Sequence, residues 1–290
     1  MHRNYFDLRF DIIMEHELKD ITAVVNHKGG VAKTSTVLSL AGGLLRENKN
    51  ARVLVIDIDP QCNLSTLCGW NTDKTNKQTN IYNTLSEEGE GSGIPVYKTD
   101  RGIYFSPASK WLKIDLDLRN QDIPQGVLWN RFGLPIDDHT GDGLTTIEDS
   151  FDYIFIDCPP ALSDVTCNAI VVASRVLIPV QLEPFSINGL ADILLKQAEL
   201  DRKLRKMLHG QNYEEQETVI VPVITGSKTK ISRGYLQYLQ DAFGDYLSKC
   251  CIRKDVKIQE SQALFKDIFE YAPYSRVAID YEMLIKELYN

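Results

Sequence analysis

The sequence predicts a doubly wound α/β fold, in which helices cover both faces of a mostly parallel sheet, and two observations support this prediction. Short runs rich in valine and isoleucine are typical of buried parallel strands, which are apolar throughout rather than alternating. Stretches with apolar residues three and four positions apart lie between these runs and predict helices packed on a sheet. Strands that alternate with helices form βαβ units and one largely parallel sheet. The expected strands span residues 21–26, 52–57, 153–157, 176–181 and 219–224.

Helices are expected directly after the first and fourth of these strands. The first has an apolar stripe over residues 37–45, and the second runs from about residue 187 to residue 208. Residues 71–93 and 121–143 are rich in polar residues, glycine and proline, so we expect two long surface loops there. Residues 1–19 are expected to be an N-terminal appendage, and residues 20–290 a single domain.

Composition excludes several classes of protein. Of the 290 residues, 43% are hydrophobic and 25% are charged, which is ordinary globular usage and excludes wholesale disorder. No apolar run reaches the ~18–20 residues of a membrane span, and the N-terminus lacks the pattern of a secretory signal. The six cysteines form no CxxC pair, and no histidine stands at metal-ligand spacing, so we expect reduced cysteines and no structural metal site. The net charge of −8 argues against a nucleic-acid partner only if the charge is evenly distributed.

The most informative segment is residues 26–35, NHKGGVAKTS, between the first expected strand and the first helix. Paired glycines let the backbone turn tightly so that successive N–H groups can face an anion, and the helix N-terminus adds partial positive charge. Lys33 is placed to reach the β- and γ-phosphates of a nucleotide, and the Thr34 hydroxyl to bind Mg²⁺. The strict GxxxxGK[ST] pattern is not met, because His27 and Ala32 stand where it has glycines. A glycine-rich turn that merely precedes a Lys-Thr pair is the alternative interpretation.

Carboxylates at the ends of two other expected strands favour the nucleotide site. Asp57 and Asp59 end or follow the second strand, and Asp157 ends the third. Active sites of open parallel sheets lie at the carboxyl ends of the strands, so these carboxylates should meet the glycine-rich loop in one crevice. Because charges are rarely buried unpaired, a cation and a lysine would explain why carboxylates end apolar strands.

These motifs resemble those of the ParA/MinD family of deviant-Walker P-loop ATPases. Residues 28–35 are similar to the family's KGGxxK[ST] loop, residues 57–61 (DIDPQ) to its second motif, and residues 155–160 (FIDCPP) to its Walker B motif. Residues 180–190 are similar to the stretch after the next strand, and residues 252–257 and 269–276 resemble the plasmid and chromosome partition branch, ParA/Soj. The resemblance covers most of residues 20–290 and implies a P-loop NTPase fold with ATP and Mg²⁺ as cofactors.

The resemblance also implies roles for the matching residues. Lys33 and Thr34 would hold the triphosphate and Mg²⁺, and Lys28 would reach the partner subunit's nucleotide in an ATP-sandwich dimer. Asp59 would position the attacking water, while Asp57 and Asp157 would hold Lys28 and the Mg²⁺ shell. The expected catalytic residues are Lys28, Lys33 and Asp59, and the expected metal residues are Thr34, Asp59 and Asp157. The expected nucleotide contacts are Gly29, Gly30, Val31, Ala32, Lys33, Thr34, Ser35, Asp57 and Asp157. Ala32 departs from the family's usual glycine, and we expect its methyl group to be tolerated if φ there is negative.

A basic zone lies near the C-terminal end of this acidic chain. Residues 228–257 contain seven lysines and arginines against three aspartates. Such a zone indicates a binder of phosphate backbones, although a solvated surface is the alternative interpretation. The resemblance implies non-specific DNA binding through this region, with Lys230, Arg233, Arg253, Lys254 and Lys257 as the expected contacts.

The expected function is therefore a DNA-partitioning ATPase, cytoplasmic and associated with the nucleoid. It would form an ATP-dependent homodimer, bind DNA in that state, and be released when a ParB-like centromere-binding partner stimulates hydrolysis. The main alternative is a membrane-cycling ATPase of the MinD type, but residues 279–290 are acidic rather than a basic amphipathic helix, and no membrane partner is expected. A reductase of the nitrogenase iron-protein type lacks matching cysteine motifs here. Intact Lys33, Thr34 and Asp59 weigh against a scaffold that binds nucleotide without hydrolysing it.

Overall fold

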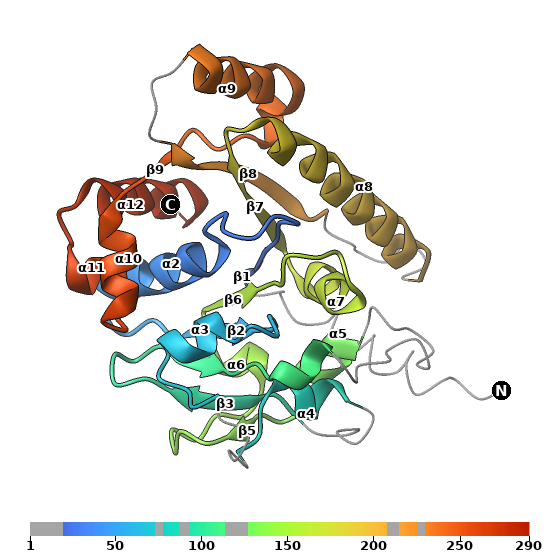
Figure 1. Cartoon of the computed structure of the whole chain (residues 1–290). Coiled ribbons are helices and arrows are strands. Elements are labelled where there is room, and N and C mark those ends of the chain that lie inside the picture. The colour runs from blue at the N-terminus through green and yellow to red at the C-terminus, as the bar shows by residue number, and fades with distance from the viewer. Residues whose placement is uncertain are drawn as a thin grey trace.

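The computed structural model describes residues 20–72, 78–86, 93–113, 127–207, 215–225 and 230–289 (Figure 1). These residues contain a nine-stranded sheet with the order β5-β3-β4-β2-β6-β1-β7-β8-β9. The β3–β4 pair is antiparallel, and the other neighbouring pairs are parallel. The strands are β1 (Asp20–Val24), β2 (Val53–Asp57), β3 (Pro95–Lys98), β4 (Tyr104–Ser106), β5 (Asp137–Asp138), β6 (Tyr153–Asp157), β7 (Arg175–Gln181), β8 (Glu217–Thr225) and β9 (Ile252–Arg253). The predicted doubly wound, mostly parallel sheet is confirmed.

The five strands predicted from the sequence form the contiguous middle of the sheet, β2-β6-β1-β7-β8. Their side chains alternate between two cores. In β2, Leu54 and Ile56 belong to one buried cluster, whereas Val53 and Val55 belong to the other. Both faces of the central strands are therefore buried, which explains why these strands read as unbroken apolar runs.

Helices cover both faces (Figure 1). On one face, α2 (Lys33–Glu47) packs with α11 (Ile268–Tyr271) and α12 (Arg276–Tyr289), and on the other α7 (Asp164–Val172) packs with α5 (Val127–Phe132) and α8 (Pro184–Met207). The remaining helices are α3 (Asn63–Leu67), α4 (Ile81–Leu85), α6 (Ile147–Ser150), α9 (Lys230–Phe243) and α10 (Val256–Ala263), with 3₁₀ turns at Lys110–Lys113 and Gly244–Tyr246. The two helices expected from apolar periodicity correspond to α2 and α8.

The final helix packs closely on the helix that begins at the glycine-rich loop. A Cβ atom at Gly43 of α2 would overlap the Ile285 side chain of α12 and lie 2.8 Å from Cε2 of Phe269. Tyr281 of α12 is fully buried, and its hydroxyl lies 3.2 Å from Thr36 Oγ1. The acidic C-terminal segment is thus part of the core. None of the described helices is long and apolar enough to cross a membrane.

Both segments predicted as long loops contain helices. In the first, α4 buries Ile81 and Leu85, and in the second, α5 buries Leu128 and Trp129. Short β5 also lies in the second segment. The loop prediction was wrong for these residues, because elements of two to six residues are too short to show a period among their polar neighbours. The appendage at residues 1–19 lies outside the described residues, as do residues 73–77, 87–92 and 121–126 of the two predicted loops.

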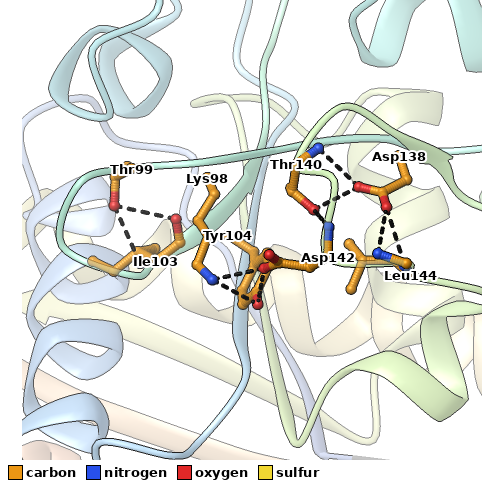
Figure 2. Close-up of polar contacts among 9 residues, drawn as sticks. Lys98, Thr99, Ile103, Tyr104, Asp138, Thr140, Asp142 and Leu144 are labelled. Carbon is orange, nitrogen blue, oxygen red and sulfur yellow. Dashed lines mark hydrogen bonds and ion pairs between the residues drawn. The ribbon is translucent and has the colours of Figure 1, made fainter.

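Figure 2 shows how the stretch after β5 is fixed to the edge of the sheet. The Asp138 carboxylate accepts hydrogen bonds from the backbone N–H groups of Thr140, Gly143 and Leu144. Asp142 Oδ2 lies 2.6 Å from both Lys98 Nζ and the Tyr104 hydroxyl of the β3–β4 hairpin. Hydrogen bonds and an ion pair, rather than hydrophobic burial, therefore fix the mostly polar residues 138–144.

Candidate nucleotide-binding site

The loop between β1 and α2 has the geometry of an anion cradle. Gly30 has φ 75°, a left-handed conformation that glycine adopts without steric cost. Neither Gly29 nor Gly30 has an atom within 4 Å of where a Cβ would lie, so the space over the loop backbone is open. The helix N-terminus points its free N–H groups and partial positive charge to this place.

Ala32 occupies the N-cap of α2 with φ 62° and ψ 25°. We expected its methyl group to be tolerated if φ were negative, and the structure shows the opposite sign. The left-handed region disfavours any residue with a Cβ by about 1–2 kcal/mol. The chain therefore keeps a strained alanine at a position that suits glycine, and the backbone carbonyl of Ala32 still accepts the first helical bond, from Thr36 N at 2.8 Å.

Lys33 extends beneath this loop. Its side chain is buried, and its Nζ donates to the Lys28 carbonyl oxygen at 3.3 Å. Burial lowers the pKa of the Lys33 ammonium, while the nearby Asp157 carboxylate opposes the shift. This contact keeps the ammonium group of Lys33 beside the loop backbone, where it could contact the oxygens of a phosphate bound by the loop.

Thr34 and Asp157 meet at the carboxyl end of β6. The Thr34 hydroxyl donates to Asp157 Oδ2 at 2.6 Å, whereas Asp157 Oδ1 is buried with no hydrogen-bond partner among the described residues. Burial raises the pKa of Asp157 well above its usual range, and the charge of Asp57, its neighbour across the β2–β6 pair, adds to the shift. A hydroxyl beside an unsatisfied carboxylate oxygen is a donor set that suits Mg²⁺, which binds proteins through one or two carboxylates and completes its shell with phosphate and water.

Asp57 is held by the segment that follows it. Its Oδ2 accepts from the Ser65 backbone N–H at 2.8 Å and the Ser65 hydroxyl at 2.6 Å, and its Oδ1 accepts from Asp59 N at 3.0 Å. Burial raises the pKa of the Asp57 carboxyl to about 7, although the hydrogen bonds from Ser65 pull in the other direction. Asp59 is also buried, and its Oδ1 accepts from the backbone N–H of Gln61 at 2.9 Å.

Lys28 does not contact the residues expected to hold it. The structure places its Nζ 2.7 Å from Gln181 Oε1 and 2.6 Å from Glu183 Oε2, at the carboxyl end of β7, rather than against Asp57 or Asp157. The physical reason is that both aspartates are enclosed behind the loop, whereas Lys28 lies on its outer side and is 37% exposed. Its backbone N–H donates to Asn26 Oδ1 at 2.8 Å, which anchors the residue itself.

Sequence reasoning missed Gln181 and Glu183 as site residues. The signal that identified Asp57 and Asp157 was available for them too, since they also stand where a buried strand ends.

A further contact joins the site to the C-terminal region, because Gln262 Nε2 of α10 donates to Ser35 Oγ at 2.9 Å. Val31, the remaining expected nucleotide contact, is fully buried in the loop.

The five expected DNA contacts differ in availability. Arg253 binds the buried Asp280 through two of its nitrogens, with distances of 2.6–3.0 Å, and Lys257 Nζ lies 2.7 Å from Glu260 Oε2. Lys254 and Arg233 are exposed. Lys230 is the first residue of α9, and its side chain lies outside the described residues. Arg253 and Lys257 are thus engaged within the chain.

Comparisons with known proteins agree with this geometry. A family model described as an AAA domain matches residues 19–209. The chain is 30% identical to the sporulation initiation inhibitor protein Soj of Bacillus subtilis, over 92% of this chain and 97% of that protein. It is 28% identical to the chromosome partitioning protein ParA of Caulobacter vibrioides, over 87% and 86%. Among solved structures, cobyrinic acid a,c-diamide synthase of Mycobacterium smegmatis with bound ATP analogue and magnesium matches with a TM-score of 0.68 and 25% identity, over 93% and 94% of the two chains.

Proposed function

The chain belongs to the ParA/MinD family of P-loop ATPases, and on this basis we propose that it is a DNA-partitioning ATPase whose DNA binding is switched by ATP. The observation that carries the proposal is the convergence of buried Lys33, the Thr34 hydroxyl and the unsatisfied oxygen of Asp157 at one open glycine-rich loop. These groups are the ones that a magnesium–nucleotide complex requires. Lys33 and Thr34 are adjacent, whereas Asp157 lies 123 residues after Thr34 in the sequence.

The proposed cofactors are ATP and Mg²⁺. Backbone N–H groups of residues 29–35 would bind the phosphates, Lys33 would contact the β- and γ-phosphates, and Thr34 with Asp157 would hold Mg²⁺. Bound Mg²⁺ supplies neutralisation of the charge that develops on the phosphate oxygens. The chain contributes position and electrostatics, because Lys33 is already desolvated and Asp157 is held by Thr34 before ligand arrives.

Hydrolysis needs an oriented water and added positive charge. We assign the water to Asp59, which is buried on the loop after β2 and fixed by its hydrogen bond with Gln61 N–H. We assign the added charge to Lys28, whose partly exposed side chain lies on the outer side of the loop and would reach the nucleotide of a second subunit. A cation delivered only by a partner couples hydrolysis to assembly, as arginine fingers do when they are supplied in trans.

Non-specific DNA would bind the ATP-bound dimer through exposed cations that include Arg233 and Lys254. Two copies of a weak basic surface double the number of phosphate contacts, so binding becomes both tighter and more salt-dependent. A ParB-like partner would stimulate hydrolysis and release the protein, which would be cytoplasmic and nucleoid-associated. The similarity to the partition proteins of Bacillus and Caulobacter supports this proposal.

The test is retention of the purified protein on non-specific duplex DNA with ATP, ADP or no nucleotide, at low and moderate salt. We expect retention that requires ATP and falls steeply with salt. Lys28→Ala should still bind ATP but should lose dimerisation, DNA retention and stimulated hydrolysis. The control Lys203→Ala, which changes an exposed residue of α8, should behave as the parent protein. Absence of retention in every nucleotide state would overturn the DNA proposal, and ATP-dependent binding to liposomes would favour a membrane-cycling ATPase instead.

A further inference from the structure

The carboxyl end of β7 forms a clasp on Lys28, defined by Gln181 and Glu183. The Lys28 ammonium donates to Gln181 Oε1 at 2.7 Å and forms an ion pair with Glu183 Oε2 at 2.6 Å. Both partners lie on the same chain as Lys28, 153 and 155 residues away in sequence. The clasp is therefore a tertiary contact made by the isolated subunit.

The clasp is linked to the nucleotide loop at other points. Gln181 Nε2 donates to the Gly30 carbonyl oxygen at 3.2 Å, so the same side chain contacts both Lys28 and the turn of the loop. Asn26, which binds the Lys28 backbone N–H, itself donates to the Pro179 carbonyl oxygen of β7 at 2.6 Å. Lys28 is thus tied to the carboxyl end of β7 twice, by its backbone N–H through Asn26 and by its side chain directly.

The two lysines of the loop are held very differently. Lys33 is buried, and its ammonium is directed under the loop to the Lys28 carbonyl. The Lys28 side chain is 37% exposed and that of Glu183 is 57% exposed, so water screens their ion pair. A screened contact of this kind is short but weak, and its lysine can exchange partners without a large barrier.

We propose that Glu183 is a positioning residue that holds Lys28 within its own subunit until a nucleotide-bound partner competes for it. This inference rests on the proposed function, in which Lys28 serves the partner's nucleotide. Each subunit must then break its own clasp before its Lys28 can cross to the other subunit. The clasp therefore opposes dimerisation.

The structure sets the size of the effect. An exposed ion pair contributes about 0.2–1 kcal/mol, which corresponds to a change of about 1.4- to 5-fold in an equilibrium constant. A symmetric dimer opens two clasps, so removal of the Glu183 charge should strengthen dimerisation by about 2- to 25-fold.

The experiment compares Glu183→Gln with the parent protein and with Glu282→Gln, a control that removes a carboxylate from an exposed ion pair on α12, with Lys286 at 2.8 Å. Sedimentation velocity at saturating ATP gives the protein concentration for half-dimerisation, and an ATP titration gives the nucleotide affinity. We expect Glu183→Gln to lower the half-dimerisation concentration by about 2- to 25-fold and to raise unstimulated hydrolysis, with ATP affinity unchanged. Glu282→Gln should match the parent protein.

A second comparison separates positioning from a general structural effect. In a Lys28→Ala background, Glu183→Gln should change neither the unfolding temperature nor the residual self-association, because the group that it acts on is gone. If the parent protein dimerises with ATP and Glu183→Gln dimerises equally or less well, the clasp is refuted while the proposed function stands. If the parent protein fails to dimerise with ATP, the proposed function fails, and this inference fails with it.

Discussion

The alanine at the N-cap of α2 provides a sharp test of the loop geometry. At φ 62°, Ala32 is disfavoured by about 1–2 kcal/mol relative to glycine. Glycine loses part of this advantage, about 0.5–1 kcal/mol, because it has more conformational freedom in the unfolded chain. Ala32→Gly should therefore raise the free energy of unfolding by about 0.5–1 kcal/mol, which for a chain of this size is a rise in Tm of about 2 °C.

The assay is urea or thermal unfolding of the nucleotide-free protein. Ala198→Gly is the matched control, since Ala198 is exposed in the interior of α8, where glycine costs about 1 kcal/mol relative to alanine. The same chemical change should thus stabilise at one position and destabilise at the other. A loss of stability for Ala32→Gly as large as that for Ala198→Gly would show that residue 32 has an ordinary negative φ, and the reasoning would be refuted.

Three further predictions concern buried and exposed charge. Burial raises the pKa of Asp57 to about 7 in the folded protein, so the unfolded chain loses this proton first, and the free energy of unfolding should fall as pH rises from about 4 to about 7. Urea titrations at several pH values should show a smaller fall for Asp57→Asn, and an equal fall in both proteins would contradict this. Arg253→Ala should destabilise the protein by about 2 kcal/mol, because it leaves the buried Asp280 unpaired, and Asp280→Asn in the same chain should recover part of the loss. Lys254→Ala should leave the Tm unchanged but lower the log–log salt slope of ATP-dependent DNA retention by about 0.9 per lost phosphate contact; an unchanged slope would remove Lys254 from the interface.

The sequence predicts the centre of this fold well and its edge poorly, for a physical reason. Strands such as β2 and β6 are covered on both faces, so their sequences are continuous apolar runs. The strand ends predicted from these runs agree with the structure to within a residue or two. At the edge of the sheet beyond β2, the strands β3, β4 and β5 have only four, three and two residues. Their pairing depends on contacts such as that between Asp142 and Lys98, which join residues 44 positions apart and leave no local pattern.

The same distinction applies to the candidate site. That Thr34 and Asp157 meet follows from topology, since a loop after one parallel strand and the end of its neighbour must share an edge of the sheet. Which carboxylate holds Lys28 does not follow, because several carboxylates gather at that edge. Burial decides between them, as Asp57 is enclosed and already accepts three hydrogen bonds, while Glu183 is exposed and within reach.

Arg253 and Lys254 illustrate how tertiary contacts change the meaning of a charge count. The two are adjacent in sequence and both are exposed, yet Arg253 is bound to the buried Asp280. The basic zone of residues 228–257 therefore offers fewer available cations than its composition suggests. Since affinity for DNA falls with salt in proportion to the number of phosphates contacted, a small number of contacts makes the single subunit a weak binder at physiological salt. Doubling that number by dimerisation changes the affinity far more than twofold. A sparse surface is thus better suited than a dense one to a switch in which ATP controls DNA binding through assembly alone.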